Sequence, residues 1–132
     1  MELFYENQFI QIFYLPDIHI VKAVWNPISN MMVEADFKTS IQQIWNAVKH
    51  YRPVGFLGDT RFFSYVVTID LQQWYGQNIG DTFGTHTKRI AMLVTSELIA
   101  QLSIEQTIEE DHSTVITQYF DNEDRATKWL LS

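Results

Sequence analysis

Apolar and polar residues alternate at the beginning of the chain, whereas apolar residues recur at helical spacing further along. The alternation predicts three β-strands, at Leu3–Glu6, Phe9–Tyr14 and Ile18–Trp25. The third segment is apolar on both faces, which is typical of a strand covered on both sides. The turn Leu15-Pro16-Asp17 separates the second strand from the third, because proline presets φ at the second position of a turn.

The middle of the chain contains the clearest helical pattern. Apolar residues recur at steps of three and four from Val33 to Val48, which predicts an amphipathic helix. Pro27 ends the preceding strand, and Ser29-Asn30 is predicted to cap the helix. The helix is expected to end at Arg52-Pro53, because proline disfavours helical backbone at the residue before it.

The second half of the chain alternates between predicted strands and helices. The first are a strand at Val54–Leu57, a helix at Ile69–Tyr75 capped by Thr68, and a glycine-rich loop at residues 76–84. A strand at Ile90–Val94 follows, and then a helix capped by Ser96 with a second capping pattern at Ser103–Gln106. The last are a strand at Val115–Phe120 and a terminal helix capped by Asp121 or Asn122. The pattern predicts one α/β domain over residues 1–132. Its mixed β-sheet is expected to begin with antiparallel strands and to continue through βαβαβα crossovers.

Composition and charge exclude several classes of function. The chain has 132 residues, enough to bury roughly two thirds of its unfolded surface. Its net charge is −7, of which residues 97–132 contribute −6. A chain this acidic lacks the positive surface that nucleic acids and anionic membranes attract, so we expect neither as a partner.

The chain contains no cysteine, which excludes disulfides, thiol catalysis and cysteine metal sites. Its first residues do not have the basic and then apolar pattern of a signal peptide. No apolar stretch approaches the ~18 residues of a membrane-spanning helix. We therefore expect a soluble, cytoplasmic domain.

Polar residues at the predicted strand ends are the first candidates for chemistry, because open α/β sheets bind ligands there. Asp59 and Thr95 follow neighbouring strands and fit, by position, a phosphoacceptor site like that of two-component receivers. Such a site also needs a lysine after the last strand and carboxylates after the first. The chain has Phe120-Asp121 and Asn26 at those places. The alternative interpretation makes Asp59 a turn residue and Thr95 a helix cap.

The histidines and one acidic cluster give weaker signals. His19, His50, His86 and His112 lack the spacing that places two ligands on one face, so no metal and no other cofactor is predicted. The run Glu109-Glu110-Asp111-His112 is typical of a solvated helix end. The chain also lacks a nucleophile elbow, a P-loop and a dinucleotide-binding glycine motif, so we predict no enzymatic activity.

Aromatic residues gather between positions 62 and 83, where charges are sparse. The candidate surface for a protein partner or an apolar ligand consists of Phe62, Phe63, Tyr65, Trp74 and Phe83. Phe62, Phe63 and Tyr65 are too close in sequence for all three to point inward, so at least one is expected to be exposed. Exposed aromatic side chains favour contact with a partner.

Segments spread over almost the whole chain form a series with a recognisable order and spacing. They are the strand ending at Trp25, the first long helix with Phe37, the segment Leu57–Arg61, the helix with Trp74, the strand Lys88–Val94, and the segments Gln101–Glu105, Tyr119–Asp121 and Ala126–Leu130. In this order they resemble the SpoIIAA-like group of small bacterial domains, of the STAS/Sec14-type fold class. The resemblance implies a β-sheet with helices and a non-enzymatic role in protein association or small-ligand sensing.

In the anti-sigma-factor antagonists of this class, a serine in an Asp-Ser-Ser-Gly-like turn is phosphorylated and controls partner binding. The resemblance places Asp59, Thr60 and Arg61 at this turn, with Thr60 as the phosphate acceptor. The chain departs from the pattern, because the glycine is missing and Arg61 and Phe62 follow instead. We therefore expect a regulatory protein-interaction module with an unidentified protein partner. A carrier or sensor of a small apolar ligand is the alternative, and homodimerisation is a further hypothesis.

Overall fold

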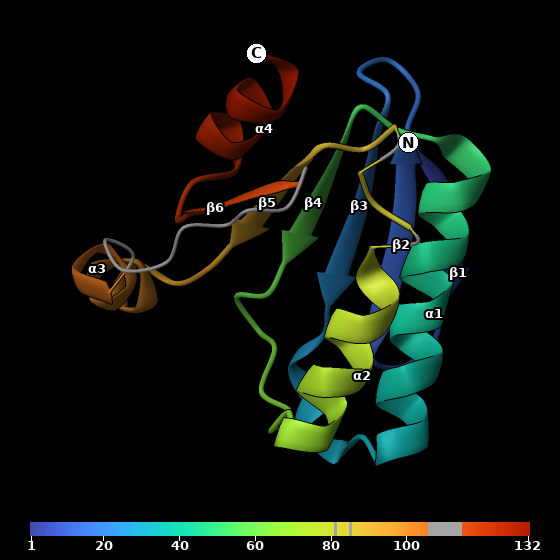
Figure 1. Ribbon diagram of the computed structural model, residues 1–132, viewed down its shortest axis with the longest axis vertical. Coiled ribbons are helices and arrows are strands. Elements are labelled where there is room, and N and C mark those ends of the chain that lie inside the picture. Colours follow the sequence, from blue (N-terminus) through green and yellow to red (C-terminus); the bar gives the residue numbers. More distant parts are fainter. Residues whose placement is uncertain (81, 85, 106–114) are drawn as a thin grey trace.

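Six β-strands form one mixed sheet in a computed structural model of the chain, which describes residues 1–80, 82–84, 86–105 and 115–132 (Figure 1). The strands are β1 (Glu2–Glu6), β2 (Ile10–Leu15), β3 (Ile20–Trp25), β4 (Gly55–Asp59), β5 (Arg89–Leu93) and β6 (Ile116–Phe120), and they lie side by side in chain order. The pairs β1–β2 and β2–β3 are antiparallel, and the pairs from β3 to β6 are parallel. The predicted mixed sheet with an antiparallel start is confirmed.

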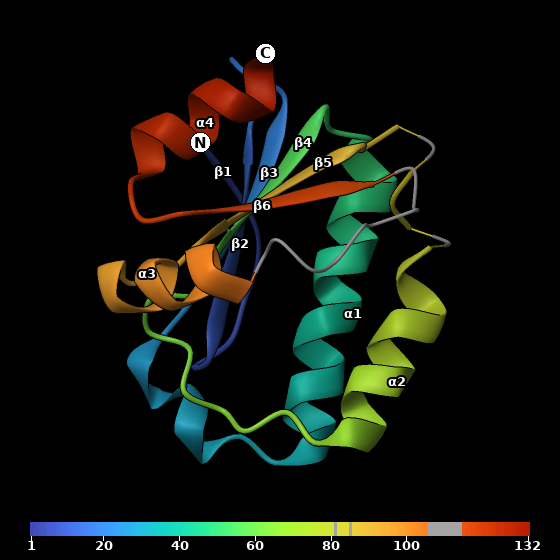
Figure 2. The same ribbon diagram turned by 60° about the vertical axis from the view of Figure 1, so that its left-hand side comes forward.

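The helices cover the two faces of this sheet unequally. They are the 3-10 helix η1 (Pro27–Met31) and the α-helices α1 (Glu34–Tyr51), α2 (Ile69–Ile79), α3 (Ser96–Glu105) and α4 (Glu123–Leu131). The helices α1 and α2 lie together on one face, whereas α4 lies on the other (Figure 2). None of the helices in the described part of the chain has the length and apolar character needed to cross a lipid bilayer.

Side chains cap two helices as the sequence predicts. Thr68 accepts a hydrogen bond from the Leu71 amide at the start of α2, and Asn122 accepts one from the Arg125 amide at the start of α4. The helix α2 runs beyond the predicted end at Tyr75, through the glycine at position 76, to Ile79.

The predicted caps of α1 and α3 are wrong. Ser29-Asn30 belongs to η1, and α1 begins later, where the Asp36 carboxylate accepts a hydrogen bond from the Val33 amide at 3.0 Å. For α3, Thr95 accepts from the Leu98 amide, and Ser96 is already the first helical residue. The predicted second start at Ser103 is also wrong, because α3 continues unbroken to Glu105, and residue 106 lies outside the described residues.

Large aromatic side chains fill the layer between the sheet and the helices α1 and α2. We call this group the aromatic layer; its members are Trp25, Phe37, Trp45, Phe63, Tyr65 and Trp74. The ring of Phe37 lies 5.3 Å from that of Tyr65 and 6.3 Å from that of Trp25. Trp45 of α1 and Trp74 of α2 have ring centroids 5.1 Å apart, so aromatic contacts join the two helices to each other as well.

Aliphatic side chains form the buried layer under α4, and the rings of Phe120 and Trp129 pack at its margin. Its members are Ile20, Leu57, Ala91, Leu93, Ala126 and Leu130. The helix approaches β4 so closely that a Cβ atom at Gly55 would lie 2.8 Å from Leu130 Cδ2. A side chain at this point of the sheet would therefore displace Leu130.

Candidate functional site

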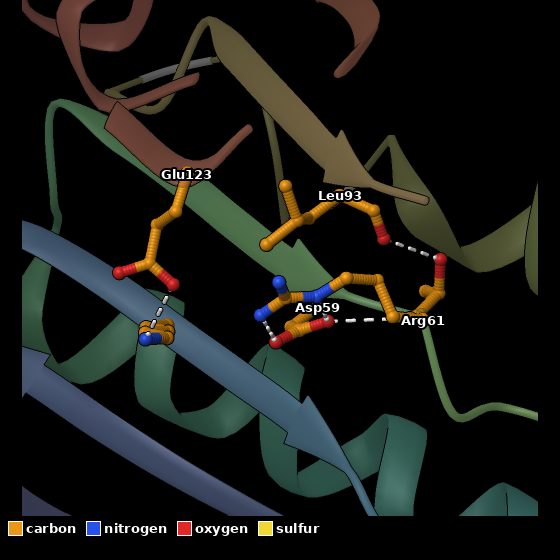
Figure 3. A network of polar contacts seen from close by, with 6 residues as sticks. Asp59, Arg61, Leu93 and Glu123 are labelled. Atoms are coloured by element: carbon orange, nitrogen blue, oxygen red, sulfur yellow. Dashed lines mark hydrogen bonds and ion pairs between the residues drawn. The ribbon is translucent and has the colours of Figure 1, made fainter. Parts of the chain in front are cut away.

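The turn after β4 is organised by an ion pair between Asp59 and Arg61 (Figure 3). Asp59 is the last residue of β4, and it is only 4% exposed. Arg61 Nε donates to Asp59 Oδ1 at 3.0 Å, and Arg61 Nη2 donates to Oδ2 at 2.8 Å. The Arg61 backbone amide also donates to Oδ1, at 3.2 Å. A two-residue spacing thus yields a side-chain turn combined with a bidentate salt bridge.

This geometry keeps the Asp59 carboxylate ionised. Burial acts to raise the pKa of Asp59, but the hydrogen bonds from Arg61 and the positive charges of Arg61 and Lys22 outweigh it and hold the pKa below its usual value. The hydrogen bond to Asp59 raises the pKa of Arg61 in turn. Both carboxylate oxygens are occupied, and Thr95 caps α3. These contacts favour the interpretation of Asp59 and Thr95 as structural residues over a phosphoacceptor site.

A second ion pair, which the sequence did not reveal, lies beside the first. Lys22 Nζ of β3 contacts Glu123 Oε1, at the first turn of α4, at 3.0 Å (Figure 3). The two pairs interact electrostatically, since Lys22 helps to lower the pKa of Asp59 and Glu123 helps to raise that of Arg61. The available signal was a lysine within the otherwise apolar third strand.

The Thr60 hydroxyl takes part in the pairing of β4 with β5. Thr60 Oγ1 donates to the Leu93 carbonyl oxygen at 2.9 Å, and the Thr60 amide donates to the same oxygen, also at 2.9 Å. A phosphoryl group on Oγ1 would remove this donor and place negative charge against a carbonyl oxygen. In this conformation the hydroxyl is therefore engaged in the fold.

The five predicted aromatic surface residues divide into one outward and four inward rings. Phe62 is 59% exposed, which meets the expectation for at least one of the three adjacent rings. Phe63, Tyr65 and Trp74 are half-buried in the aromatic layer. Phe83 is buried and lies 5.8 Å from Phe56. This packing favours a structural role for the four inward rings.

Phe62 belongs to a larger set of exposed apolar side chains at the carboxyl ends of β3 and β4. We call this set the apolar tip; its members are Ile28, Met31, Val33, Phe62, Val66 and Ile69. They come from η1, from the residues before α1, from the segment between β4 and α2 and from the first residue of α2. These segments lie at the same end of the molecule (Figures 1 and 2). Of these residues, only Phe62 is predicted from the sequence as a surface residue. The signal for the others was the apolar run Met31-Met32-Val33, which comes directly before α1.

Buried Ser29 joins the two segments of the apolar tip. Its Oγ atom donates to the Phe62 carbonyl at 3.3 Å and accepts from the Ser64 amide at 3.0 Å. The segment after β4 is thereby held against η1, and this connection fixes the backbone on which Phe62 is presented.

The histidines lie at separate places in the fold. His19 precedes β3 with a left-handed φ of 57° rather than within a strand, and its ring is hydrogen-bonded to the Tyr14 hydroxyl. His50 lies at the end of α1, and His86 lies between α2 and β5. In the described ranges, no three His, Asp or Glu side chains converge as metal ligands. The acidic run at 109–112, with His112, lies outside the described residues.

Comparison of the chain with models of protein families, with curated proteins and with solved structures found no match. The functional interpretation therefore depends on the residues described above. They divide into two neighbouring ion pairs, one within the turn after β4 and one between β3 and α4, and an exposed apolar tip next to that turn.

Proposed function

We propose that the chain is a non-enzymatic protein-interaction module of SpoIIAA-like arrangement, which contacts a protein partner through the apolar tip. One observation carries the proposal: the exposed apolar side chains of two segments distant in sequence are held at one end of the molecule. Phe62 is 59% and Val66 81% exposed, and neither belongs to the hydrophobic clusters of the part of the chain that the structure describes. Contiguous exposed apolar residues are characteristic of interaction surfaces.

The construction of the apolar tip favours binding of a partner. Ser29 and the Asp59–Arg61 pair hold the backbone on both sides of Phe62 before any partner arrives. Preorganisation lowers the entropic cost of binding, because fewer torsions need to be ordered. Aromatic residues and methionine are also enriched in protein interfaces, and the apolar tip contains Phe62 and Met31.

The resemblance to SpoIIAA-like domains supports the same location. In that group, the phosphorylated turn controls partner binding, and here Asp59-Thr60-Arg61 leads directly into Phe62. The mixed sheet with parallel crossovers agrees with such an arrangement. The proposed module does not need phosphorylation of Thr60, whose hydroxyl is bonded to Leu93.

Charge indicates the chemistry of the partner. Acidic residues follow the apolar tip in the first turns of both neighbouring helices, namely Glu34 and Asp36 in α1 and Asp70 in α2. The chain as a whole has a net charge of −7. We therefore propose a partner segment with apolar side chains flanked by lysine or arginine, since such a segment complements both features.

Site-specific photo-crosslinking tests the proposal. A photoreactive phenylalanine analogue replaces Val66 in the apolar tip or, as the control, Val54, which is 46% exposed at the opposite end of β4. In a native lysate, we expect position 66 to crosslink one protein that position 54 does not. Excess native chain should suppress this crosslink, whereas excess Phe62→Asp chain should not. Crosslinks that are shared by both positions, or that the Phe62→Asp chain suppresses equally, would contradict the proposal.

A further inference from the structure

The two outer strands of the sheet differ in how well they are protected against pairing with another strand. The strand β1 begins and ends with glutamate, at Glu2 and Glu6, and its register on β2 shifts between Leu3 and Tyr5. Charged residues and irregular register are the features by which natural sheets prevent edge-to-edge association. The edge at β1 is therefore poorly suited to accept a further strand.

The strand β6 has none of these features. Its sequence, Ile-Thr-Gln-Tyr-Phe, contains no charge, no proline and no glycine, and it pairs with β5 in unbroken register. β-branched and aromatic residues favour extended structure. Ile116 is 52% exposed, and it lies on the face of the sheet opposite to Tyr119, which is also exposed. This uncharged edge strand therefore presents an exposed apolar or aromatic side chain on each face of the sheet.

The hydrogen-bonding pattern of β6 shows which groups face outward. The Ile116 amide donates to the Lys88 carbonyl, and the Phe120 carbonyl accepts from the Val94 amide. In a parallel strand, alternate residues direct their backbone groups to the same side. The backbone groups of Thr117 and Tyr119 therefore point away from β5, and no strand of the described residues lies beyond them.

We propose that β6 pairs with β6 of a second copy, antiparallel and about a two-fold axis, so that the two sheets become continuous. With Gln118 on the axis, Thr117 of each copy exchanges backbone hydrogen bonds with Tyr119 of the other, and Ile116 lies opposite Phe120. The lack of charge in β6 suits pairing with a second copy. Although two chains of net charge −7 repel each other overall, this antiparallel pairing places no charged residue of one β6 strand opposite another.

This inference goes beyond the proposed function, because it concerns a different surface from the apolar tip. Its failure would leave the tip proposal unaffected, since the crosslinking experiment at Val66 does not depend on β6. The first measurement is the mass of the native chain by light scattering. We expect twice the 15.5 kDa of one chain. A monomer at every concentration overturns the proposal, including the case in which β6 pairs with a strand of a different protein.

The absence of native cysteine allows a direct test of the register. Opposed residues of a non-hydrogen-bonded antiparallel pair have Cα atoms about 4.5 Å apart, within the range that a disulfide spans. Gln118→Cys should therefore form a covalent dimer on mild oxidation. The control, Leu3→Cys, places the thiol on the other edge strand at 51% exposure and should remain monomeric. Equal crosslinking of the two variants overturns the assignment.

A proline variant measures the contribution of the outward backbone groups. Thr117→Pro removes an outward N–H from each copy and leaves the donors toward β5 in place, so dimerisation should weaken by about tenfold or more. A circular dichroism spectrum checks that the variant folds. Because the cysteine experiment does not require this variant, a folding failure here leaves the register test decisive. A folded Thr117→Pro chain that dimerises as tightly as the native chain overturns the proposal.

Discussion

The two faces of the sheet are stabilised by different means. On one face, the aromatic layer packs beneath the two helices α1 and α2, with large rings in contact with one another. On the other, one short helix, α4, packs on aliphatic residues, and two ion pairs continue the contact surface beyond its N-terminus. Contacts between rings dominate the first layer, whereas in the second the helix lies close to the backbone of β4 at Gly55.

This difference explains where the candidate surfaces lie. The rings of the aromatic layer are occupied with one another, so they are poorly available to a partner. The apolar tip lies at the end of this layer, where neither helix covers the side chains. Exposure at the tip, rather than aromatic content, is therefore the better indicator of an interaction surface in this chain.

Truncation within the aromatic layer should produce the largest loss of stability. Phe37 contacts rings on the sheet, on α2 and in the segment after β4, so Phe37→Ala is expected to lower the free energy of unfolding by about 3–5 kcal/mol. Urea unfolding followed by tryptophan fluorescence measures the change. Phe120→Ala, on the other face, removes a half-buried ring near Trp129 and should cost clearly less. Equal losses would show that the two faces are not different in this respect.

The close approach of α4 to β4 predicts that a single added methyl group at Gly55 lowers the free energy of unfolding. Gly55→Ala places a Cβ atom 2.8 Å from Leu130 Cδ2, which should cost about 1–3 kcal/mol in thermal or urea unfolding. In a Gly55→Ala/Leu130→Ala double variant, the two losses should be less than additive, because the second substitution removes the clash. Gly76→Ala is the matched control. It meets no atom within 4 Å in α2 and should be stabilising by about 0.5–1 kcal/mol.

The ion pair at the turn predicts that replacing Asp59 lowers the free energy of unfolding by an amount that depends on pH. Because the pKa of Asp59 is lower in the folded chain than in the unfolded chain, ionisation stabilises the fold above the usual aspartate pKa of about 3.9. This contribution disappears as the pH falls through the lowered pKa. Asp59→Asn should lower the free energy of unfolding by about 1–3 kcal/mol near neutral pH. In acid, the free energies of unfolding of the variant and the native chain should become equal. A difference in stability that is constant with pH would contradict the ion-pair account; Asp17→Asn, in an exposed turn, is the control.

The smallest predicted change in stability is at Phe62, and its neighbour Phe63 provides the comparison. Phe62→Ala should change the free energy of unfolding by less than about 0.5 kcal/mol, because the ring is exposed. Phe63→Ala removes a ring 4.8 Å from that of Trp25 and should cost at least about 2 kcal/mol. Denaturant unfolding of both variants side by side measures the difference. A large loss from Phe62→Ala would mean that this ring belongs to the core and not to the apolar tip.

Local sequence patterns predicted most of the secondary structure. The strands and the helices α1, α2 and α4 follow from periodicity and capping, which depend on neighbours a few residues apart. The pairing of Asp59 with Arg61 is also local, although the sequence marked these residues as a candidate turn without indicating the salt bridge. The predicted helix cap at Ser29 was wrong because a long-range contact, which the local pattern does not contain, decides its role. A serine before a helix fits a cap locally, but Ser29 bonds to a segment 35 residues away.

The sequence by itself determined the order of the elements, the mixed sheet and the net charge of −7. The tertiary structure alone decided which phenylalanine faces outward, and it joined Lys22 to Glu123 across 101 positions of the chain. It also brought the members of the apolar tip together. Periodicity indicates the face of its own element on which a residue lies, but it does not show which element covers that face. The packing of distant elements decides that, and the pattern of neighbours along the chain does not encode it.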